Sequence, residues 1–181
     1  MQNKNIWIFI VIALVAVMLI GNRKVRLGAV LKEQLYVFRN AKNNNISVYD
    51  CCCFLVFPWV VSGICVCKLD FVVKKELAEL LTTVFSIVFT VLFGFAAVMV
   101  GKIDSENKKE KQVAEETFVS IVSATLMSLI SAVISIFLTE IQSEIAVKVM
   151  SIGLLGSSLI VVMLLLLITK RTFLLYIDNK K

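Results

Sequence analysis

The sequence predicts an all-α, polytopic helical membrane protein of about five transmembrane helices, which form a single bundle over residues 1–181 with one cytoplasmic amphipathic helix. Hydrophobic residues make up 59% of the chain, and its mean hydropathy is +0.92. Residues 77–100, LAELLTTVFSIVFTVLFGFAAVMV, carry a single charge, at Glu79. A bilayer core about 30 Å thick needs roughly 20 apolar helical residues to cross it. The apolar runs are continuous rather than alternating, which favours helices over strands.

The apolar runs place the five expected spans in order along the chain. The first covers about residues 6–21; only Lys4 precedes it, whereas Arg23, Lys24 and Arg26 follow it, and no small-residue cleavage pattern appears. We therefore expect an uncleaved anchor with the N-terminus outside. The remaining spans are expected at about 51–67, 77–100, 118–139 and 149–169.

The distribution of lysine and arginine predicts an orientation with the N-terminus outside and the C-terminus inside. Five spans in this orientation leave 14 Lys and Arg residues on the inside and 5 on the outside, which agrees with the excess of basic residues in cytoplasmic loops. The second run contains Pro58, the only proline, which predicts a kink there. If this run were re-entrant instead of spanning, the later helices would invert and the charge bias would be lost.

The expected cytoplasmic helix, about residues 23–42, is basic and amphipathic. Leu27, Leu31, Leu35 and Phe38 recur at helical spacing, so they form one apolar side of this helix. Such a helix lies in the lipid headgroup layer, packs under the bundle or docks a partner. The residues expected to contact the membrane surface or a partner are Arg23, Lys24, Arg26, Lys32 and Arg39. Farther along, Ser47 and Asp50 have the spacing of a capping box for the second span.

Small and hydroxyl-bearing residues recur at helical spacing in the last three expected spans. Such residues allow transmembrane helices to approach closely and to form hydrogen bonds across the contact. They predict packing of these spans into one bundle and assembly of a homo-oligomer. The alternative is that some hydroxyl-bearing faces line a polar pathway across an oligomer. The predicted packing residues are Thr82, Ser86, Thr90, Gly94, Ser120, Ala124, Ser128, Ala132, Ser135, Gly153 and Ser157.

The residues that usually carry chemistry are scarce. The chain has no histidine, no glycine-rich phosphate-binding motif and no ionisable residue clearly at the centre of a span, which argues against general-base catalysis and proton-coupled transport. All five cysteines lie in the second expected span without metal-ligand spacing, so we interpret them as small apolar side chains. The sequence thus predicts no catalytic, cofactor-binding or metal-binding residue, and no enzyme. The net charge of +6 is attributed to loops near anionic lipid rather than to binding of nucleic acid.

One resemblance covers most of the chain. The segment LKEQLYVFRN leads through NISVYD into an apolar run, LLTTVFSIVFTVLFGFAAV follows, and a short charged connector and two more runs complete the order. This layout resembles small multi-span bacterial membrane proteins of antiphage defence systems, such as the membrane subunit of the Kiwa system. The resemblance implies a homo-oligomeric membrane component that pairs with a soluble cytosolic effector during infection.

Two functional hypotheses follow. The first is a non-enzymatic scaffold or sensor in the bacterial inner (plasma) membrane, which assembles as a homo-oligomer in the lipid bilayer and presents basic cytoplasmic segments to a soluble partner. The alternative is a pore-forming effector or ion channel, which would use the hydroxyl-bearing faces of the third and fourth spans.

Overall fold

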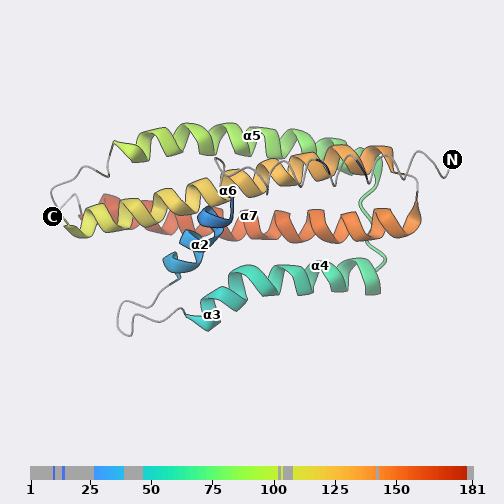
Figure 1. Cartoon of the computed structure of the whole chain (residues 1–181), viewed down its shortest axis with the longest axis horizontal. Coiled ribbons are helices and arrows are strands. Elements are labelled where there is room, and N and C mark those ends of the chain that lie inside the picture. The colour runs from blue at the N-terminus through green and yellow to red at the C-terminus, as the bar shows by residue number, and fades with distance from the viewer. Residues whose placement is uncertain are drawn as a thin grey trace.

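The protein is built from helices joined by short connections (Figure 1). The computed structural model describes Ile10, Leu14 and residues 27–38, 47–101, 103, 108–141 and 143–178. Within these residues every regular element is helical. The elements are α2 (Leu27–Val37), α3 (Val48–Cys51), the π-helical segment η1 (Cys52–Val56), α4 (Phe57–Lys68), α5 (Lys75–Val100), α6 (Lys108–Glu140) and α7 (Glu144–Asp178).

Four helices in the described part of the chain are long and apolar enough to cross a membrane: Val48–Lys68, Lys75–Val100, Lys111–Glu140 and Glu144–Leu174. They confirm the predicted all-α class and contain the last four predicted runs. The first predicted run, residues 6–21, lies outside the described residues except for Ile10 and Leu14, which are both helical. The length and apolar composition of the four helices identify an integral membrane protein with several spans.

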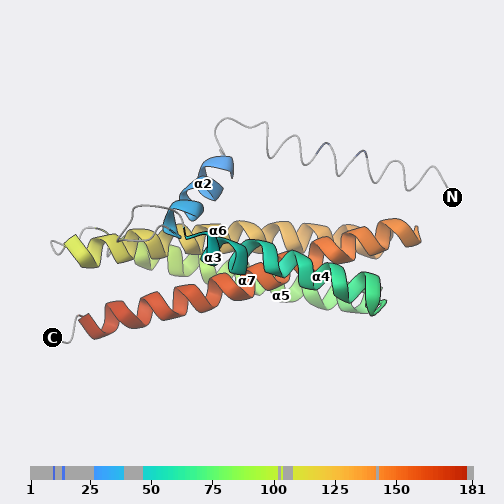
Figure 2. The ribbon, with the colours of Figure 1, turned by 90° about the horizontal axis from the view of Figure 1, so that it is seen from below.

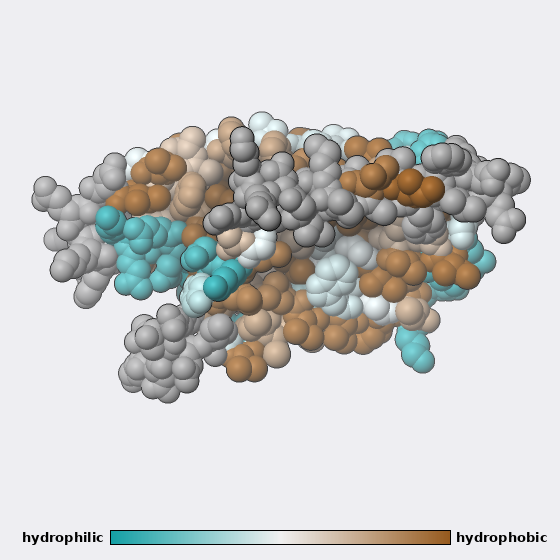
Figure 3. Space-filling model, in the orientation of Figure 1, coloured by the Kyte–Doolittle hydropathy of each residue, from teal (hydrophilic) through white to brown (hydrophobic). Residues whose placement is uncertain are grey.

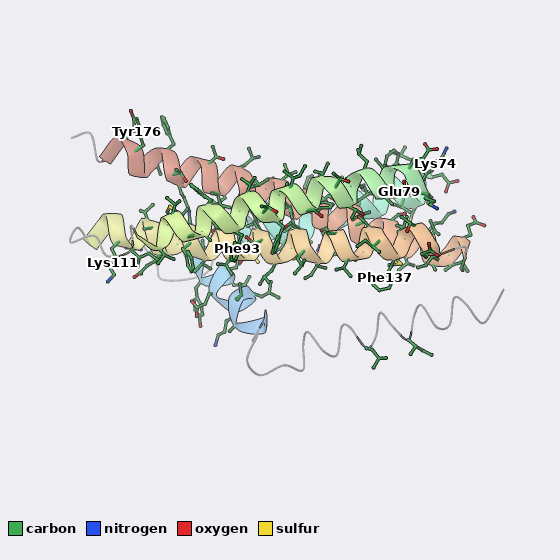
Figure 4. All side chains as sticks on the ribbon, turned by 90° about the horizontal axis from the view of Figure 1, so that it is seen from above. Lys74, Glu79, Phe93, Lys111, Phe137 and Tyr176 are labelled. Carbon is green, nitrogen blue, oxygen red and sulfur yellow. The ribbon has the colours of Figure 1, made fainter. Side chains whose placement is uncertain are left out.

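The four long helices alternate in direction, so each connection joins two helix ends that lie at the same end of the bundle (Figure 1). Figure 4 places Lys111 and Tyr176 at one end of the bundle and Lys74 and Glu79 at the other. We call these the Lys111 end and the Lys74 end. The charge distribution predicts that the Lys111 end is cytoplasmic. In Figure 3 hydrophobic surface covers much of the face between the ends, where the lipid tails would lie.

Helix α6 is the centre of the bundle because α5, α7 and α2 all pack against it (Figures 1 and 2). Leu92 and Met99 of α5, Ile121 of α6 and Leu164 of α7 share one buried apolar cluster in the half nearer the Lys111 end. A second cluster joins the same three helices toward the Lys74 end, with Phe85 among its members. Lipid tails are as apolar as these side chains, so close packing rather than burial from water holds the helices together in a bilayer.

The second span is one continuous helical stretch that contains an unusual turn. Pro58 has no backbone N–H, and its ring clashes with the carbonyl of the residue four positions earlier. The chain accommodates this proline by widening the turn before it into η1, where the Phe57 N–H donates to the Cys52 carbonyl, five residues earlier. Such π-helical turns are a recognised cause of helix bending. All five cysteines, which lie in this stretch, are free.

Helix α2 packs on the bundle through a face that differs in part from the predicted one. Gln34 and Phe38 are buried and Leu35 is half-buried, but Leu31 is 52% exposed. The chain then enters α3 at Ser47, whose Oγ accepts a hydrogen bond from the Asp50 N–H at 3.3 Å. This is the N-cap half of the predicted capping box. The reciprocal half is not formed, because the Ser47 N–H donates instead to the Phe38 carbonyl at 2.9 Å.

Candidate functional site

A cavity of about 580 Å³ opens among α2, α3, η1 and α7 toward the Lys111 end; we call it the α2–α7 cavity. Phe38 and Phe54 form part of its wall, and their ring centroids lie 5.2 Å apart. This ring contact holds the end of α2 against η1. The described lining residues are Val37, Phe38, Ser47, Asp50, Phe54, Met163, Leu166, Leu167, Lys170 and Arg171.

Arg171 ties three elements together beside this cavity. Its Nη2 lies 3.1 Å from Glu116 Oε2 of α6 and donates a hydrogen bond to the Val37 carbonyl near the end of α2 at 3.4 Å. The other carboxylate oxygen of Glu116 accepts from Gln112 Nε2 at 3.0 Å. The Arg171 side chain is only 14% exposed, so this pair lies in a poorly hydrated setting, where charged hydrogen bonds are stronger than in water.

Besides Arg171, the described cavity wall carries two charged side chains, Asp50 and Lys170, which do not form an ion pair with each other. Asp50 is half-buried and Lys170 is exposed, and no ion pair joins them or pairs either one with another residue described here. The cavity therefore combines one available carboxylate, one available ammonium group and a largely apolar wall.

The predicted packing residues of α6 lie inside the bundle. Ser120, Ala124, Ser128, Ala132 and Ser135 are all buried. Most buried hydroxyls of this helix donate to a backbone carbonyl one turn earlier, as Ser120 does to Glu116 at 3.0 Å. That arrangement satisfies a hydroxyl in an apolar environment without a partner on another helix. One contact does cross between helices: Ser131 Oγ and Ser157 Oγ of α7 lie 2.7 Å apart.

The predicted stripe of α5 has a different position. Thr82 is half-buried, but Ser86, Thr90 and Gly94 are exposed. The buried side of this helix is instead formed by Ala78, Phe85, Leu92 and Met99. Residues four apart drift by about 40° per step around a helix, whereas residues seven apart drift by only about 20°. The series with a spacing of four therefore turns away from α6 between Thr82 and Gly94. The series with a spacing of seven, from Ala78 to Met99, stays buried along the helix.

On α7 a glycine beside the predicted pair lies against a side chain of α4. A Cβ added at Gly153 meets nothing within 4 Å, whereas one added at Gly156 would lie 2.8 Å from Cε3 of Trp59 in α4. Ser157, the other predicted residue, is buried. The sequence marks Gly156 as a small residue, but only the position of the Trp59 ring shows that Gly156 is the one in contact.

The predicted surface-contact residues are described only in part. Lys32 is exposed on α2, with its Nζ 5.9 Å from the Tyr36 ring centroid. Arg23, Lys24, Arg26 and Arg39 lie outside the described residues. Arg171, Glu116, Asp50 and Lys170 form no motif in the sequence that predicts a site. The sequence shows only an arginine shortly after one apolar run and a glutamate just before another. Their pairing depends on the antiparallel arrangement of α6 and α7.

Comparisons of the chain with models of known protein families, with curated proteins and with solved structures gave no match. The lengths and apolar composition of its helices identify the chain as a helical membrane protein with several spans.

Proposed function

We propose that the chain is a non-enzymatic membrane scaffold or sensor, which assembles as a homo-oligomer and docks a soluble cytosolic partner as part of antiphage defence in the bacterial inner membrane. The observation that carries the proposal is the outward position of Ser86, Thr90 and Gly94 on α5. A second copy of the chain can approach closely there, because small residues let helix backbones come together in lipid.

The hydroxyls of this outward stripe do not oppose a helix contact. Ser86 Oγ donates to the Thr82 carbonyl at 2.8 Å and Thr90 Oγ1 donates to the Ser86 carbonyl at 2.9 Å. Each hydroxyl donor is thereby satisfied within α5, and its oxygen retains capacity to accept a further bond. At Gly94 an added Cβ would meet no atom within 4 Å, so the backbone is open to a neighbouring helix.

The Lys111 end supplies the surface proposed for the soluble partner. Helix α7 continues to Asp178, beyond the apolar span that ends at Leu174. Phe173, just before the end of that span, and Tyr176, beyond it, are 61% and 64% exposed. Exposed aromatic side chains beside charged residues are common in protein interfaces. Lys32 of α2 and Lys111 of α6 add exposed positive charge.

The test is affinity purification of the tagged full chain in mild detergent from a host that also expresses the neighbouring genes. The native mass and the co-purifying chains are both measured. We expect an oligomer that carries a soluble partner in a fixed ratio. A monomer that recovers no partner would contradict the proposal.

A pore-forming effector is the second candidate, favoured by the exposed hydroxyl-bearing positions Ser86 and Thr90, which would face one another around the axis of a ring-shaped oligomer. Apart from Thr139, the hydroxyls of α6 do not serve this role in a single copy, because they are buried. Conductance of the full chain reconstituted in planar bilayers, compared with a Thr90→Val variant, distinguishes the candidates. A pore predicts altered conductance with unchanged assembly, whereas a scaffold predicts no conductance from either protein.

A further inference from the structure

The polarity of the α2–α7 cavity changes in one direction along α7. Met163, Leu166 and Leu167 line its apolar part, and Lys170 and Arg171 follow within the next turn. Met163 and Arg171 are separated by about 12 Å along the helix axis. This gradient runs from the apolar interior of the span toward its charged end. A phospholipid beside the protein has the same gradient, from acyl chain to headgroup.

The charges of the described cavity wall select among headgroups. Arg171 already pairs with Glu116 at 3.1 Å, so this cation is compensated within the protein. Lys170 and Asp50 remain, with opposite charges, no partner in the described part of the chain and a shared cavity. A ligand that fits both must carry an anionic group and a hydrogen-bond-donating cation on the same short headgroup.

We propose that the α2–α7 cavity binds a phospholipid whose headgroup joins a phosphate to a primary ammonium group, the phosphatidylethanolamine class. The phosphate lies at Lys170, the ammonium group donates to the Asp50 carboxylate, and an acyl chain covers Met163, Leu166 and Leu167. Basic pockets between transmembrane helices at the membrane surface are established sites for lipid headgroups. The volume of about 580 Å³ lies within the usual range for ligand sites, about 300–1,000 Å³.

Other lipid classes fit the cavity less well. Phosphatidylcholine carries a quaternary ammonium group, which has no N–H to donate to Asp50. Phosphatidylglycerol is anionic and brings no cation to Asp50, so its phosphate would enter a cavity whose carboxylate remains uncompensated. Soluble O-phosphoethanolamine has the charges but lacks the acyl chain that covers the apolar wall.

The proposal does not depend on oligomeric state and is tested on the delipidated full chain in detergent by native mass spectrometry. Phosphatidylethanolamine, phosphatidylcholine and phosphatidylglycerol with identical acyl chains are titrated separately, and O-phosphoethanolamine forms a fourth arm. We expect phosphatidylethanolamine to be retained about tenfold more tightly than phosphatidylcholine, which corresponds to one charged hydrogen bond. O-phosphoethanolamine should not be retained.

Two variants and two matched controls locate the site. Asp50→Asn should reduce the preference for phosphatidylethanolamine over phosphatidylcholine to within about twofold, and Lys170→Gln should weaken retention of all three lipids about tenfold. Glu115→Gln and Lys111→Gln make the same charge changes on exposed residues near the Lys111 end that do not line the cavity, and should retain the three lipids as the unmodified protein does. Thermal unfolding of each variant verifies that it is folded.

Three results would overturn the proposal. The first is equal retention of phosphatidylethanolamine and phosphatidylcholine, or tighter retention of phosphatidylglycerol, by the unmodified chain. The second is a phosphatidylethanolamine preference that survives Asp50→Asn as fully as it survives Glu115→Gln. The third is retention of O-phosphoethanolamine as tight as that of the lipid, which would identify a soluble ligand instead.

Discussion

Arg171 of α7 and Glu116 of α6 form an ion pair of 3.1 Å that also reaches α2 through the Val37 carbonyl. Their side chains are 14% and 34% exposed, so water screens the pair only in part. Removing one partner from a poorly hydrated pair leaves the other charge uncompensated, which costs more than loss of the attraction alone. The pair therefore fixes the relative positions of three helices at the Lys111 end.

We expect Glu116→Gln to lower the free energy of unfolding by about 1–3 kcal/mol, less than for a fully buried pair because Glu116 is partly hydrated. Glu115→Gln, on an exposed neighbouring position, should change it by less than about 0.5 kcal/mol. Thermal unfolding in detergent measures both. A double-mutant cycle with Arg171→Gln isolates the coupling, and additive effects would show that the pair does not stabilise the fold.

Gly156 and Gly153 give a second matched comparison on α7. The Cβ of Gly156→Ala would lie 2.8 Å from the Trp59 ring, so the ring or α4 must shift, at a cost of about 1–3 kcal/mol. Gly153→Ala meets no such atom and should stabilise the helix by about 0.5–1 kcal/mol, because alanine is the better helix former. Thermal unfolding together with tryptophan fluorescence separates the two. Equal effects of both substitutions would disprove the contact between Gly156 and the Trp59 ring.

These comparisons show why the sequence predicts helices better than contacts. The apolar runs locate four spans because hydrophobic length alone decides whether a helix can cross a membrane. The α5 stripe is visible in the sequence, but the sequence does not say which side of α5 contacts α6. A four-residue repeat drifts around the axis, and the buried series that contains Phe85 makes this contact. Gly156 and Arg171 acquire their roles from Trp59 and Glu116, which are distant in sequence, and no local pattern encodes such pairs.

Ser131 and Ser135 occupy successive turns of α6 but differ in hydrogen bonding. Ser131 Oγ lies 2.7 Å from Ser157 Oγ, whereas the buried Ser135 Oγ has no partner among the described residues. Ser131→Ala should destabilise the protein by about 0.6 kcal/mol, the average for a hydrogen bond between membrane helices. Ser135→Ala should be neutral or stabilising, since it removes a buried group without a partner. Unfolding midpoints that fall equally in both variants would contradict this difference.

Asp70, in the connection between α4 and α5, has a left-handed backbone conformation with φ of 51°. Its carboxylate lies 3.1 Å from Lys148 Nζ. Alanine disfavours this left-handed conformation by about 1–2 kcal/mol, whereas glycine adopts it freely. Asp70→Ala should therefore destabilise the protein by about 1–2 kcal/mol more than Asp70→Gly, although both lose the same exposed ion pair. Thermal unfolding of the two variants measures this difference. A glycine variant as unstable as the alanine variant would show that the backbone conformation is not the cause.

Gly94 and Ser128 separate assembly from folding. Gly94 lies on the exposed side of α5 and an added Cβ there meets no atom within 4 Å, while Ser128 is fully buried in α6. Gly94→Leu should leave the unfolding midpoint of the single copy unchanged or slightly raised, but it should shift the native mass in mild detergent from oligomer to monomer, because a large side chain prevents close helix approach. Ser128→Leu should instead lower the unfolding midpoint sharply, since it overfills a packed interior. If Gly94→Leu retains the full oligomeric mass, the contact between copies does not use this side of α5, and the proposed assembly surface is wrong.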